Sequence, residues 1–321
     1  MTRARNLRVD VRASRERSSD TNVFALVGPT ASGKTEVSLQ LARRLKAEIL
    51  VVDSMTVYRG MDVGTAKPSR AQREEIPHHL IDVADPAEPF SVAQFQTLAR
   101  RAVGEVAARG HSALLVGGSG LYYRAVVDEL AFPGTDRSLR RILEAEVTAL
   151  GAEGLHARLV SIDPAAARKI PPSNVRRTVR ALEVAALTGR TFSSFGGEWD
   201  RYHPDRVRAA GVLPSAGSLD ARIRARVHRM LEDGLIDEVR SLLVEGAGAF
   251  LTASQAIGYL EVVEHLRGRL TIEEVVARTV RRTKDLARRQ MAWFRRDPRI
   301  RWFEADDAAS SLDDIEEYLR G

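Results

Sequence analysis

Eight consecutive residues near the N-terminus have the types and the spacing of a phosphate-binding loop. They are Gly28, Pro29, Thr30, Ala31, Ser32, Gly33, Lys34 and Thr35. Such a loop aims backbone N–H groups and the positive end of a helix dipole at an anion. Lys34 would add a positive charge, and the hydroxyl of Thr35 is a ligand for Mg²⁺. The pattern predicts a site for a phosphate chain, and it leaves open whether a nucleotide or another pyrophosphate is bound.

A carboxylate and a hydroxyl follow two further apolar stretches. Asp53 comes directly after residues 48–52, and Ser119 lies in a glycine-rich turn after residues 113–116. Asp53 could help to hold Mg²⁺, or it could accept a proton from an incoming nucleophile. Its structural alternative is a turn or cap. The glycines around Ser119 permit either the close approach of a ligand or tight packing.

Arginines in two segments could bind phosphate. Arg222 and Arg226 are four residues apart and share one helical face, which is either solvated or a bidentate phosphate clamp. Residues 278–301 contain ten Arg or Lys residues and two Asp. On a helical wheel, the apolar residues of this segment form a stripe, and the basic residues fill the other half. This pattern favours a helix that tracks a phosphate backbone over a merely solvated face. The apolar residues are Val280, Ala287, Met291 and Phe294, flanked by Leu286 and Trp293.

The elements that must position these residues alternate in type. Residues 23–27, 48–52, 79–83 and 113–116 are strand-like, and helical stretches such as residues 91–109 lie between them. Val37, Leu41 and Leu45 recur with the period of a helix that packs on a sheet. The alternation predicts a parallel sheet with helices on both faces. Because ligands bind beyond the carboxyl ends of such strands, the phosphate loop, Asp53 and the glycine turn should converge.

The alternation stops after Phe132. Residues 136–189 read as helices, the last of which should be capped by Ser173 or Asn174 and end at Gly189. Strand character returns at residues 207–213, and helices are expected from there to the C-terminus. We therefore predict an α/β fold whose P-loop NTPase-like parallel sheet core comprises residues 21–131 and 206–321, with an inserted all-helical domain at residues 132–205.

Composition excludes several classes of protein. The chain has 321 residues, no cysteine and no apolar stretch of the roughly 18 to 20 residues that cross a bilayer. Disulfide frameworks and thiolate zinc sites are excluded, and we expect no membrane partner and a cytoplasmic location. Residues 1–20 carry six Arg and three acidic residues, which is typical of a flexible basic tail. Lysine occurs only five times, and both Lys34 and Lys67 stand within the motifs described here.

Seven stretches, taken together, resemble the bacterial tRNA dimethylallyltransferases, also called tRNA isopentenyltransferases. In the order of the family, they are GPTASGKT, VDSMTVYRGMDVGTAKP, GGSGLYYRAV, RRTVRALEV, RIRARVHRML, ASQAIGY and RRQMAWFR, and they span residues 23–303. The resemblance implies transfer of a dimethylallyl group from dimethylallyl diphosphate to the exocyclic amine of the adenosine 3′ of the anticodon. In this family the loop holds the diphosphate of the donor, with Mg²⁺ at Thr35, and no nucleotide need be hydrolysed.

The resemblance also implies roles for particular residues. Asp53 matches the general base, Arg226 the arginine that contacts the pyrophosphate, and Ser119 a position where the family often has threonine. The matching contacts to the anticodon stem-loop of tRNA are Asp53, Ser54, Met55, Thr56, Ser119, Arg140, Arg176, Arg177, Arg180, Arg288, Arg289, Gln290 and Arg295. The acceptor base must leave its stack to reach the donor. Nothing in the sequence requires more than a monomer.

Two other functions share part of this pattern. A small-molecule kinase, or a prenyltransferase acting on free adenine nucleotides, would have the same loop and a similar aspartate, but neither requires the basic helix. An NTP-driven nucleic-acid-binding module would usually end an apolar strand in an Asp-Glu pair, whereas this chain has Asp53 followed by Ser54.

Overall fold

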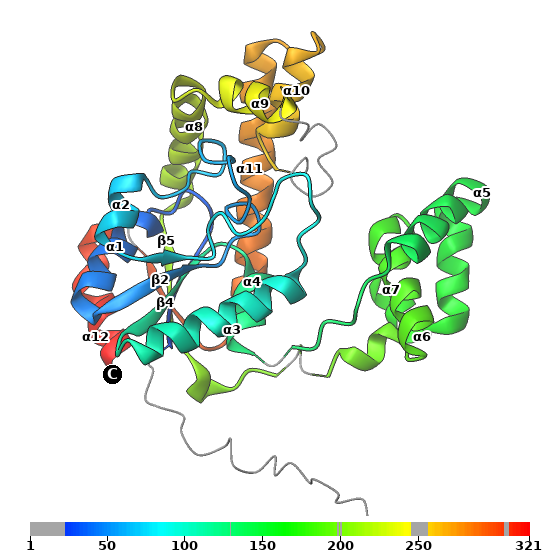
Figure 1. Cartoon of the computed structure of the whole chain (residues 1–321), viewed down its shortest axis with the longest axis horizontal. Coiled ribbons are helices and arrows are strands. Elements are labelled where there is room, and N and C mark those ends of the chain that lie inside the picture. Colours follow the sequence, from blue (N-terminus) through cyan, green and yellow to red (C-terminus); the bar gives the residue numbers. More distant parts are fainter. Residues whose placement is uncertain (1–22, 129, 198, 200, 245–255, 305–307) are drawn as a thin grey trace, which may run out of the picture. The chain divides into compact units, whose positions relative to one another are not determined.

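The computed structural model (Figure 1) describes residues 23–128, 130–197, 199, 201–244, 256–304 and 308–321. The predicted basic tail at residues 1–20 lies outside the described residues. The chain divides into two compact units, with boundaries after Tyr123 and before Pro204. The unit that interrupts the chain runs from Arg124 to His203, so it begins before the predicted insertion at residues 132–205 and ends close to the predicted boundary.

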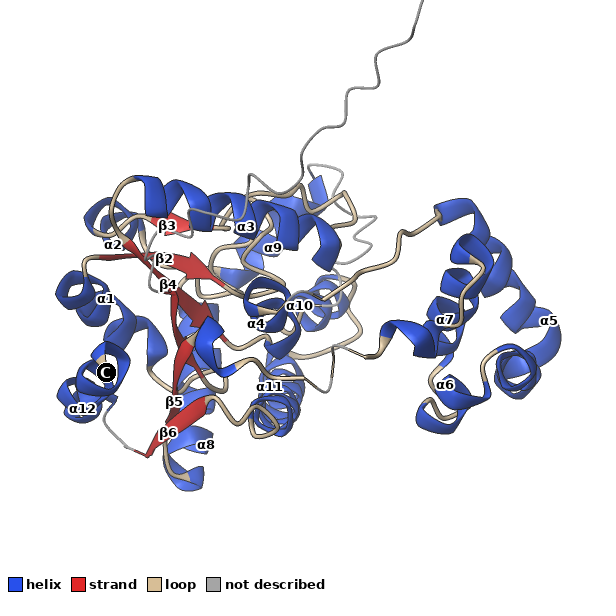
Figure 2. Cartoon of the chain, turned by 90° about the horizontal axis from the view of Figure 1, so that it is seen from below, coloured by secondary structure: helices blue, strands red, loops and turns tan. Residues whose placement is uncertain are grey.

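The first unit contains a six-stranded sheet in which every neighbouring pair is parallel. The strands are β1 (Val23–Val27), β2 (Ala47–Val51), β3 (His78–His79), β4 (Ser112–Gly117), β5 (Arg208–Leu213) and β6 (Ile300–Glu304). Their order across the sheet is β3-β2-β4-β1-β5-β6. Figure 2 shows this sheet between helices on its two faces. The parallel α/β core predicted from the sequence is confirmed.

Two strands differ from the prediction. The strand expected at residues 79–83 is limited to His78–His79, because Leu80 and Asp82 adopt left-handed backbone angles of φ 68° and 58°. A left-handed residue cannot continue a strand. In contrast, β6 lies where only helices were expected, and it pairs with β5. It is a short strand of five residues at the edge of the sheet.

The helices of the first unit begin at recognisable capping residues. Ser69, Ser91 and Thr271 each form a capping box with a Gln or Glu three residues later. The helices that lie wholly within it are α1 (Lys34–Leu45), α2 (Arg70–Glu75), α3 (Val92–Ala108), α8 (Ala216–Glu232), α9 (Leu235–Val244), α10 (Tyr259–Leu266), α11 (Ile272–Phe294) and α12 (Leu312–Arg320), and α4 (Gly120–Val127) runs across the boundary after Tyr123. None of the described helices is long and apolar enough to span a membrane.

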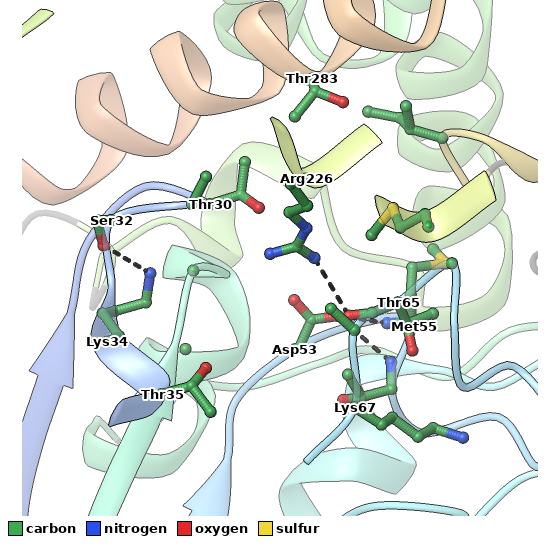
Figure 3. A pocket seen from close by; sticks show the side chains of 18 of the residues that line it. Thr30, Ser32, Lys34, Thr35, Asp53, Met55, Thr65, Lys67, Arg226 and Thr283 are labelled. Carbon is green, nitrogen blue, oxygen red and sulfur yellow. Dashed lines mark hydrogen bonds between the residues drawn. The ribbon is translucent and has the colours of Figure 1, made fainter. Parts of the chain in front are cut away.

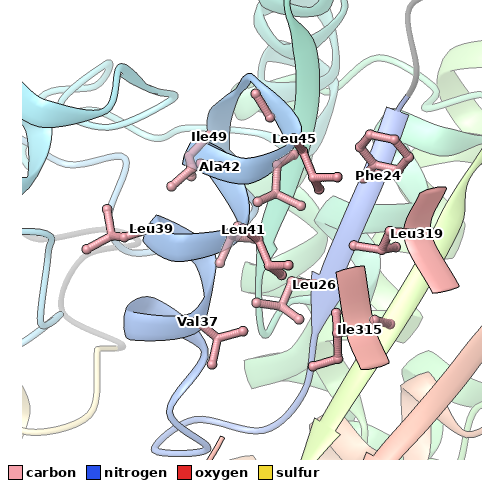
Figure 4. Close-up of a cluster of buried hydrophobic side chains, with 14 of the residues drawn as sticks. Phe24, Leu26, Val37, Leu39, Leu41, Ala42, Leu45, Ile49, Ile315 and Leu319 are labelled. Carbon is pink, nitrogen blue, oxygen red and sulfur yellow. The ribbon is translucent and has the colours of Figure 1, made fainter. Parts of the chain in front are cut away.

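The core beneath the phosphate loop is formed by the sheet, α1 and α12. Leu41 and Leu45 of α1 contact the same cluster as Leu26 of β1 and Leu319 of α12 (Figure 4). The predicted apolar stripe of α1 is confirmed, because Val37, Leu41 and Leu45 are all buried. This packing anchors both elements that flank the phosphate loop, and so it fixes the position of the loop.

The second unit has helices and no strand among its described residues, and it has its own apolar core. It contains α5 (Arg137–Ile162), α6 (Pro164–Lys169) and α7 (Val175–Thr188), followed by a 3-10 turn at Phe192–Phe195. Asn174 caps α7, and Gly189 ends it with φ 67°, as predicted. The core consists mainly of Leu143, Leu155, Leu159, Ile170, Val179 and Leu182.

Candidate active site

The phosphate loop joins β1 to the N-terminus of α1 and depends on its two outer glycines. Gly28 has φ 152°, and a Cβ atom at this position would lie 2.5 Å from the carbonyl oxygen of Val212 on β5. Gly33 is the N-cap of α1 with φ 88°, a conformation that favours glycine. The loop therefore lies against the sheet and presents the free N–H groups of the helix N-terminus.

The side chain of Lys34 folds back over this loop. Its Nζ donates to the carbonyl oxygen of Pro29 at 2.6 Å and to Oγ of Ser32 at 3.1 Å. Burial and the positive charge of Arg226 lower the pKa of Lys34 to about 7, while Asp53 acts in the opposite direction. An anion bound in the loop would favour the charged ammonium and raise this pKa again.

A cavity of about 1360 Å³ opens in front of the loop. Its walls come from residues 30–36 and 53–56, the segment 62–69, the end of β4, and the helices α8 and α11. Figure 3 shows Lys34, Asp53 and Arg226 directed into this space from three different elements. The predicted convergence of the loop, Asp53 and the glycine turn at the carboxyl edge of the sheet is observed.

Asp53 follows β2 and forms the turn that was considered from the sequence as its structural role. Its Oδ1 accepts hydrogen bonds from the backbone N–H of Met55 at 2.7 Å and of Thr56 at 3.4 Å, which is an Asx turn. Among the described residues, its Oδ2 has no hydrogen-bond partner. The turn thus holds the carboxylate at the cavity through one oxygen and leaves the other oxygen available to a ligand.

Arg226 and Arg222 lie on α8 and both line the cavity. The guanidinium of Arg226 donates to the carbonyl oxygen of Thr65 at 3.4 Å (Figure 3). Burial lowers the pKa of Arg226, and the charge of Asp53 opposes this shift. Arg226 is half-buried without an ion pair among the described residues, and its remaining N–H groups can bind an anion.

The glycine turn after β4 is shaped by close packing. A Cβ at Gly117 would lie 2.3 Å from the carbonyl oxygen of Val52, and one at Gly120 would lie 2.8 Å from the ring of Trp293. Gly117 and Gly118 line the cavity. Ser119 stands at the start of α4, and its hydroxyl accepts from the N–H of Tyr122 at 3.5 Å. Both tight packing and access to a ligand therefore apply to this turn.

The helix α11 brings Gln290 to the phosphate loop. The Oε1 of Gln290 accepts from the backbone N–H of Thr30 at 2.8 Å, and a Cβ at Gly118 would lie 2.4 Å from its Nε2. The predicted stripe of Val280, Ala287 and Phe294 is buried, but Gln290 is buried in addition, whereas Met291 is only half-buried. No local pattern in the sequence predicts this contact, because it joins residues 260 positions apart.

The basic face of α11 is partly neutralised within the protein. Arg282 pairs with the buried Glu261, Lys284 with Asp220, and Arg288 with Asp285. Arg289 and Arg295 are exposed and form no ion pair among the described residues, and Arg289 lines the cavity. These two arginines are therefore available to a polyanion.

The arginines predicted to contact tRNA in the second unit fall into two kinds. Arg140 and Arg180 both pair with the buried carboxylate of Glu183, at 2.6 and 2.7 Å. Arg180 also donates to the carbonyl oxygens of Pro133 and Gly134. Arg176 and Arg177, in the first turn of α7, are exposed. Arg140 and Arg180 thus stabilise the unit itself, whereas Arg176 and Arg177 face solvent.

Lys67, one of the few lysines of this chain, has a structural role. Its side chain is 1% exposed, and its ammonium donates to the carbonyl oxygen of Tyr58 and to the carboxylates of Asp62 and Asp82, at 2.5 to 2.6 Å. These bonds tie together the long segment that follows Asp53 and forms one wall of the cavity.

A metal ion at this site would have few protein ligands. Thr35 lines the cavity and is exposed, and the carboxylates of Glu36 and Asp53 line the same cavity. The described residues contain no group of three His, Cys, Asp or Glu side chains that could hold a metal. This donor set fits Mg²⁺, which keeps several waters and is often bound by one or two protein oxygens together with phosphate oxygens.

Comparison with known proteins agrees with the site. Residues 56–297 match the family model described as IPP transferase, and residues 21–85 match that of isopentenyl transferase. Two curated relatives are named tRNA dimethylallyltransferase, and each is 50% identical to this chain. The relative from Nocardioides sp. matches over 89% of this chain and 92% of its own length. The relative from Kineococcus radiotolerans matches over 91% of this chain and 93% of its own length.

Solved structures show the same likeness. A tRNA isopentenylpyrophosphate transferase from Bacillus halodurans is 41% identical with a TM-score of 0.68, over 94% of this chain and 96% of that one. A eukaryotic dimethylallyltransferase acting on tRNA is 25% identical with a TM-score of 0.74, over 91% of this chain and 76% of that one. The family resemblance seen in the sequence motifs is confirmed, and this chain belongs to the IPP transferase family.

Proposed function

We propose that this protein is a tRNA dimethylallyltransferase. It transfers the dimethylallyl group of dimethylallyl diphosphate to the N6 amine of the adenosine 3′-adjacent to the anticodon and releases diphosphate. The observation that carries this proposal is one cavity lined by the phosphate loop with Lys34, by Arg226, and by Asp53, one carboxylate oxygen of which accepts no hydrogen bond from the described residues.

The loop and the two basic side chains act on the leaving group. When the allylic C–O bond breaks, the carbon fragment becomes cation-like and negative charge grows on the diphosphate. Backbone N–H groups of the loop, the ammonium of Lys34 and the guanidinium of Arg226 bind this growing charge more strongly than they bind the ground state. Their fixed positions in the cavity therefore lower the barrier to departure.

Asp53 acts on the acceptor. The lone pair of an adenine amine is delocalised, so the amine is a poor nucleophile until its proton is accepted. The N6 nitrogen bonds to the allylic carbon, the C–O bond breaks, and the N6 proton passes to Asp53. The Asx turn keeps Asp53 oriented during this step, because Met55 and Thr56 hold only Oδ1.

Mg²⁺ is the metal that fits the loop. The Thr35 hydroxyl would hold it together with diphosphate oxygens, and the bound ion would neutralise charge on the leaving group. The cavity also has room for both substrates. Its volume of about 1360 Å³ exceeds the roughly 300 to 1,000 Å³ of a typical small-molecule site.

The anticodon stem-loop of tRNA is the proposed macromolecular partner. Exposed arginines on α11 and on α7 would bind its phosphates, and the target adenosine would be flipped out of its stack into the cavity. Ser54, Met55 and Thr56 follow Asp53 and line the cavity with it, and Ser119 follows β4, the strand next to β2. We propose that the extruded base arrives near these residues. We further propose that the protein acts as a monomer in the cytoplasm, where its tRNA substrate is found.

One assay separates this function from its rivals. The protein is incubated with Mg²⁺ and labelled dimethylallyl diphosphate, and unmodified tRNA, AMP and ATP are offered together. We expect label in tRNA alone and no consumption of ATP. Label in AMP would instead indicate a prenyltransferase of free nucleotides, and ATP consumption without labelled tRNA would indicate an NTP-driven enzyme.

A further inference from the structure

One wall of the cavity is held from outside by a carboxylate that the proposed reaction does not use. The backbone N–H groups of Asp62, Val63 and Gly64 all point to Glu238 on α9, at 2.8, 2.7 and 3.1 Å. We call residues 62–65 the wall segment. Three consecutive N–H groups that converge on one carboxylate fix the position of this short segment, because bonds to a charged acceptor are the stronger ones.

Tyr259 completes the acceptor shell of Glu238. Its hydroxyl donates to Oε1 of Glu238 at 2.5 Å, and its ring is 3% exposed. Burial and the charge of Glu238 raise the pKa of Tyr259, so the hydroxyl stays protonated and remains a donor. The ring also packs on the wall segment, since a Cβ at Gly64 would lie 2.3 Å from it. Glu238 and Tyr259 thus hold both the polar and the apolar side of this turn.

The far end of the wall segment contacts Arg226. The carbonyl oxygen of Thr65 accepts from Nη2 of Arg226, which is the one hydrogen bond of this guanidinium within the described chain (Figure 3). Arg226 and Glu238 belong to successive helices, α8 and α9, joined by a tight turn in which Gly234 has φ 97°. The same helix pair therefore grips the wall segment at both ends.

We propose that Glu238, oriented by Tyr259, is a positioning residue that sets the direction of Arg226 through the wall segment. It contacts no substrate. It holds the N–H side of the segment, so the Thr65 carbonyl stays where it aligns the guanidinium with the diphosphate. The inference rests on the proposed function for the reaction that it serves, but the orientation of Arg226 can be tested by anion binding alone.

The test is a double-mutant cycle between Glu238→Gln and Arg226→Ala in the full-length protein. Glutamine keeps the size of the side chain but places an NH₂ group where N–H donors converge. We expect Glu238→Gln to lower kcat/KM for dimethylallyl diphosphate about tenfold and to weaken binding of inorganic diphosphate by a similar factor, without a change in the KM for tRNA. In the Arg226→Ala background, Glu238→Gln should lower kcat/KM and the affinity for inorganic diphosphate by less than about a further twofold.

Matched variants exclude a general loss of structure. Asp237→Asn changes the neighbouring carboxylate, which is exposed and pairs only with Arg240 among the described residues, and it should leave all parameters unchanged. Tyr259→Phe keeps the Glu238 carboxylate and should give a smaller defect in the same direction, and it carries the cycle with Arg226→Ala if Glu238→Gln does not fold.

A full tenfold loss in the Arg226→Ala background, or an effect confined to tRNA, would overturn the assignment. A wild-type protein that binds diphosphate but does not modify tRNA would refute the proposed function, and the diphosphate cycle would still test Glu238.

Discussion

The electrostatics of the cavity rest on Lys34, Arg226 and Asp53. Burial lowers the pKa of both Lys34 and Arg226, the positive charge of Arg226 lowers that of Lys34 further, and the charge of Asp53 opposes both shifts. In the absence of an anion, it therefore costs free energy to keep Lys34 and Arg226 charged in the cavity. A bound diphosphate removes that cost, because it places negative charge beside both groups. The free site is thus arranged for the charge that the reaction develops.

The pKa of Lys34 predicts that diphosphate binding takes up a proton. Free Lys34, with a pKa of about 7, is largely neutral at pH 8, whereas the complex requires the ammonium. Affinity for inorganic diphosphate should therefore be highest below pH 7 and fall as the pH rises from 7 to 9. Calorimetry at pH 8 in buffers of different ionisation enthalpy measures the uptake directly.

Lys34→Met is the control for this titration. It should bind diphosphate weakly at every pH, and the proton uptake assigned to Lys34 should disappear. Stability gives a second readout. Because the folded-state pKa is lowered, the unfolded chain binds more protons between pH 7 and about 10.4, so the stability of the wild type relative to Lys34→Met should rise with pH across that window. A pH-independent affinity would show that Lys34 is already charged in the free site.

Asp53→Asn tests the proton acceptor without breaking the turn. Asparagine can still accept the N–H groups of Met55 and Thr56 through its amide oxygen, so the segment should stay folded. It cannot accept the N6 proton. We expect kcat to fall about 10² to 10⁴-fold, while the affinity for tRNA stays within about twofold. Single-turnover transfer and tRNA binding are measured on the same preparation. Lost tRNA binding with normal turnover would assign Asp53 to recognition and not to catalysis.

At the residue scale, sequence predicted what short motifs encode. The phosphate loop lies within eight residues, and its glycines are required by local backbone angles and by contact with β5. The contacts of Gln290 with Thr30 and of Glu238 with the wall segment span 260 and about 175 positions. No local spacing reports such pairs, because they arise from how α9 and α11 pack against the loops of the sheet.

At the scale of elements, a helix or strand could be predicted where its own residues carry a clear local pattern. α7 begins and ends at the predicted caps, because capping residues act within one turn, and α3 lies within the helical stretch predicted at residues 91–109. β3 ends early because of left-handed Leu80 and Asp82, and Asp82 pairs with Lys67 and Arg73, which are distant enough in sequence that no local pattern reports them. β6 was missed because five residues after a long helix offer too short a pattern to distinguish a strand.

The basic helix α11 yields a prediction that separates binding charges from structural ones. Arg289→Gln with Arg295→Gln should weaken tRNA binding and lower the slope of log affinity against log salt by about one to two, since both arginines are exposed and unpaired among the described residues. Binding is measured by filter retention or anisotropy at several salt concentrations. Arg282→Gln should instead lower stability, because it leaves the buried carboxylate of Glu261 without its partner.

Arg100→Gln is the control for loss of charge alone. Arg100 is exposed on α3, so its removal changes the net charge equally but should alter the salt slope by much less. If Arg100→Gln and the α11 variants reduce the slope by the same amount per charge, then tRNA senses the overall field of the protein and not this helix.

At the scale of the whole molecule, each of the two units has its own hydrophobic core. The first unit buries its sheet between α1, α12 and the other helices, and the described part of the second unit has an independent core of residues from α5, α6 and α7. Each core is contributed by its own unit. A domain with its own core and capped helices can in principle fold alone. The donor site belongs entirely to the first unit, since every residue that lines the cavity lies between Thr30 and Gln290 outside Arg124–His203.

This division predicts that diphosphate binding and tRNA binding can be separated by removing most of the second unit. Replacing residues 131–197 with a flexible Gly/Ser linker should leave a folded protein that binds inorganic diphosphate with near wild-type affinity, because Lys34, Asp53 and Arg226 are retained. Affinity for tRNA should fall at least about tenfold, because the exposed Arg176 and Arg177 are lost. A full-length Arg176→Gln, Arg177→Gln variant should reproduce much of that loss while its thermal unfolding matches the wild type. Loss of diphosphate binding in the truncated protein would show that the second unit is needed to form the donor site, and unchanged tRNA binding in both variants would assign recognition to the first unit alone.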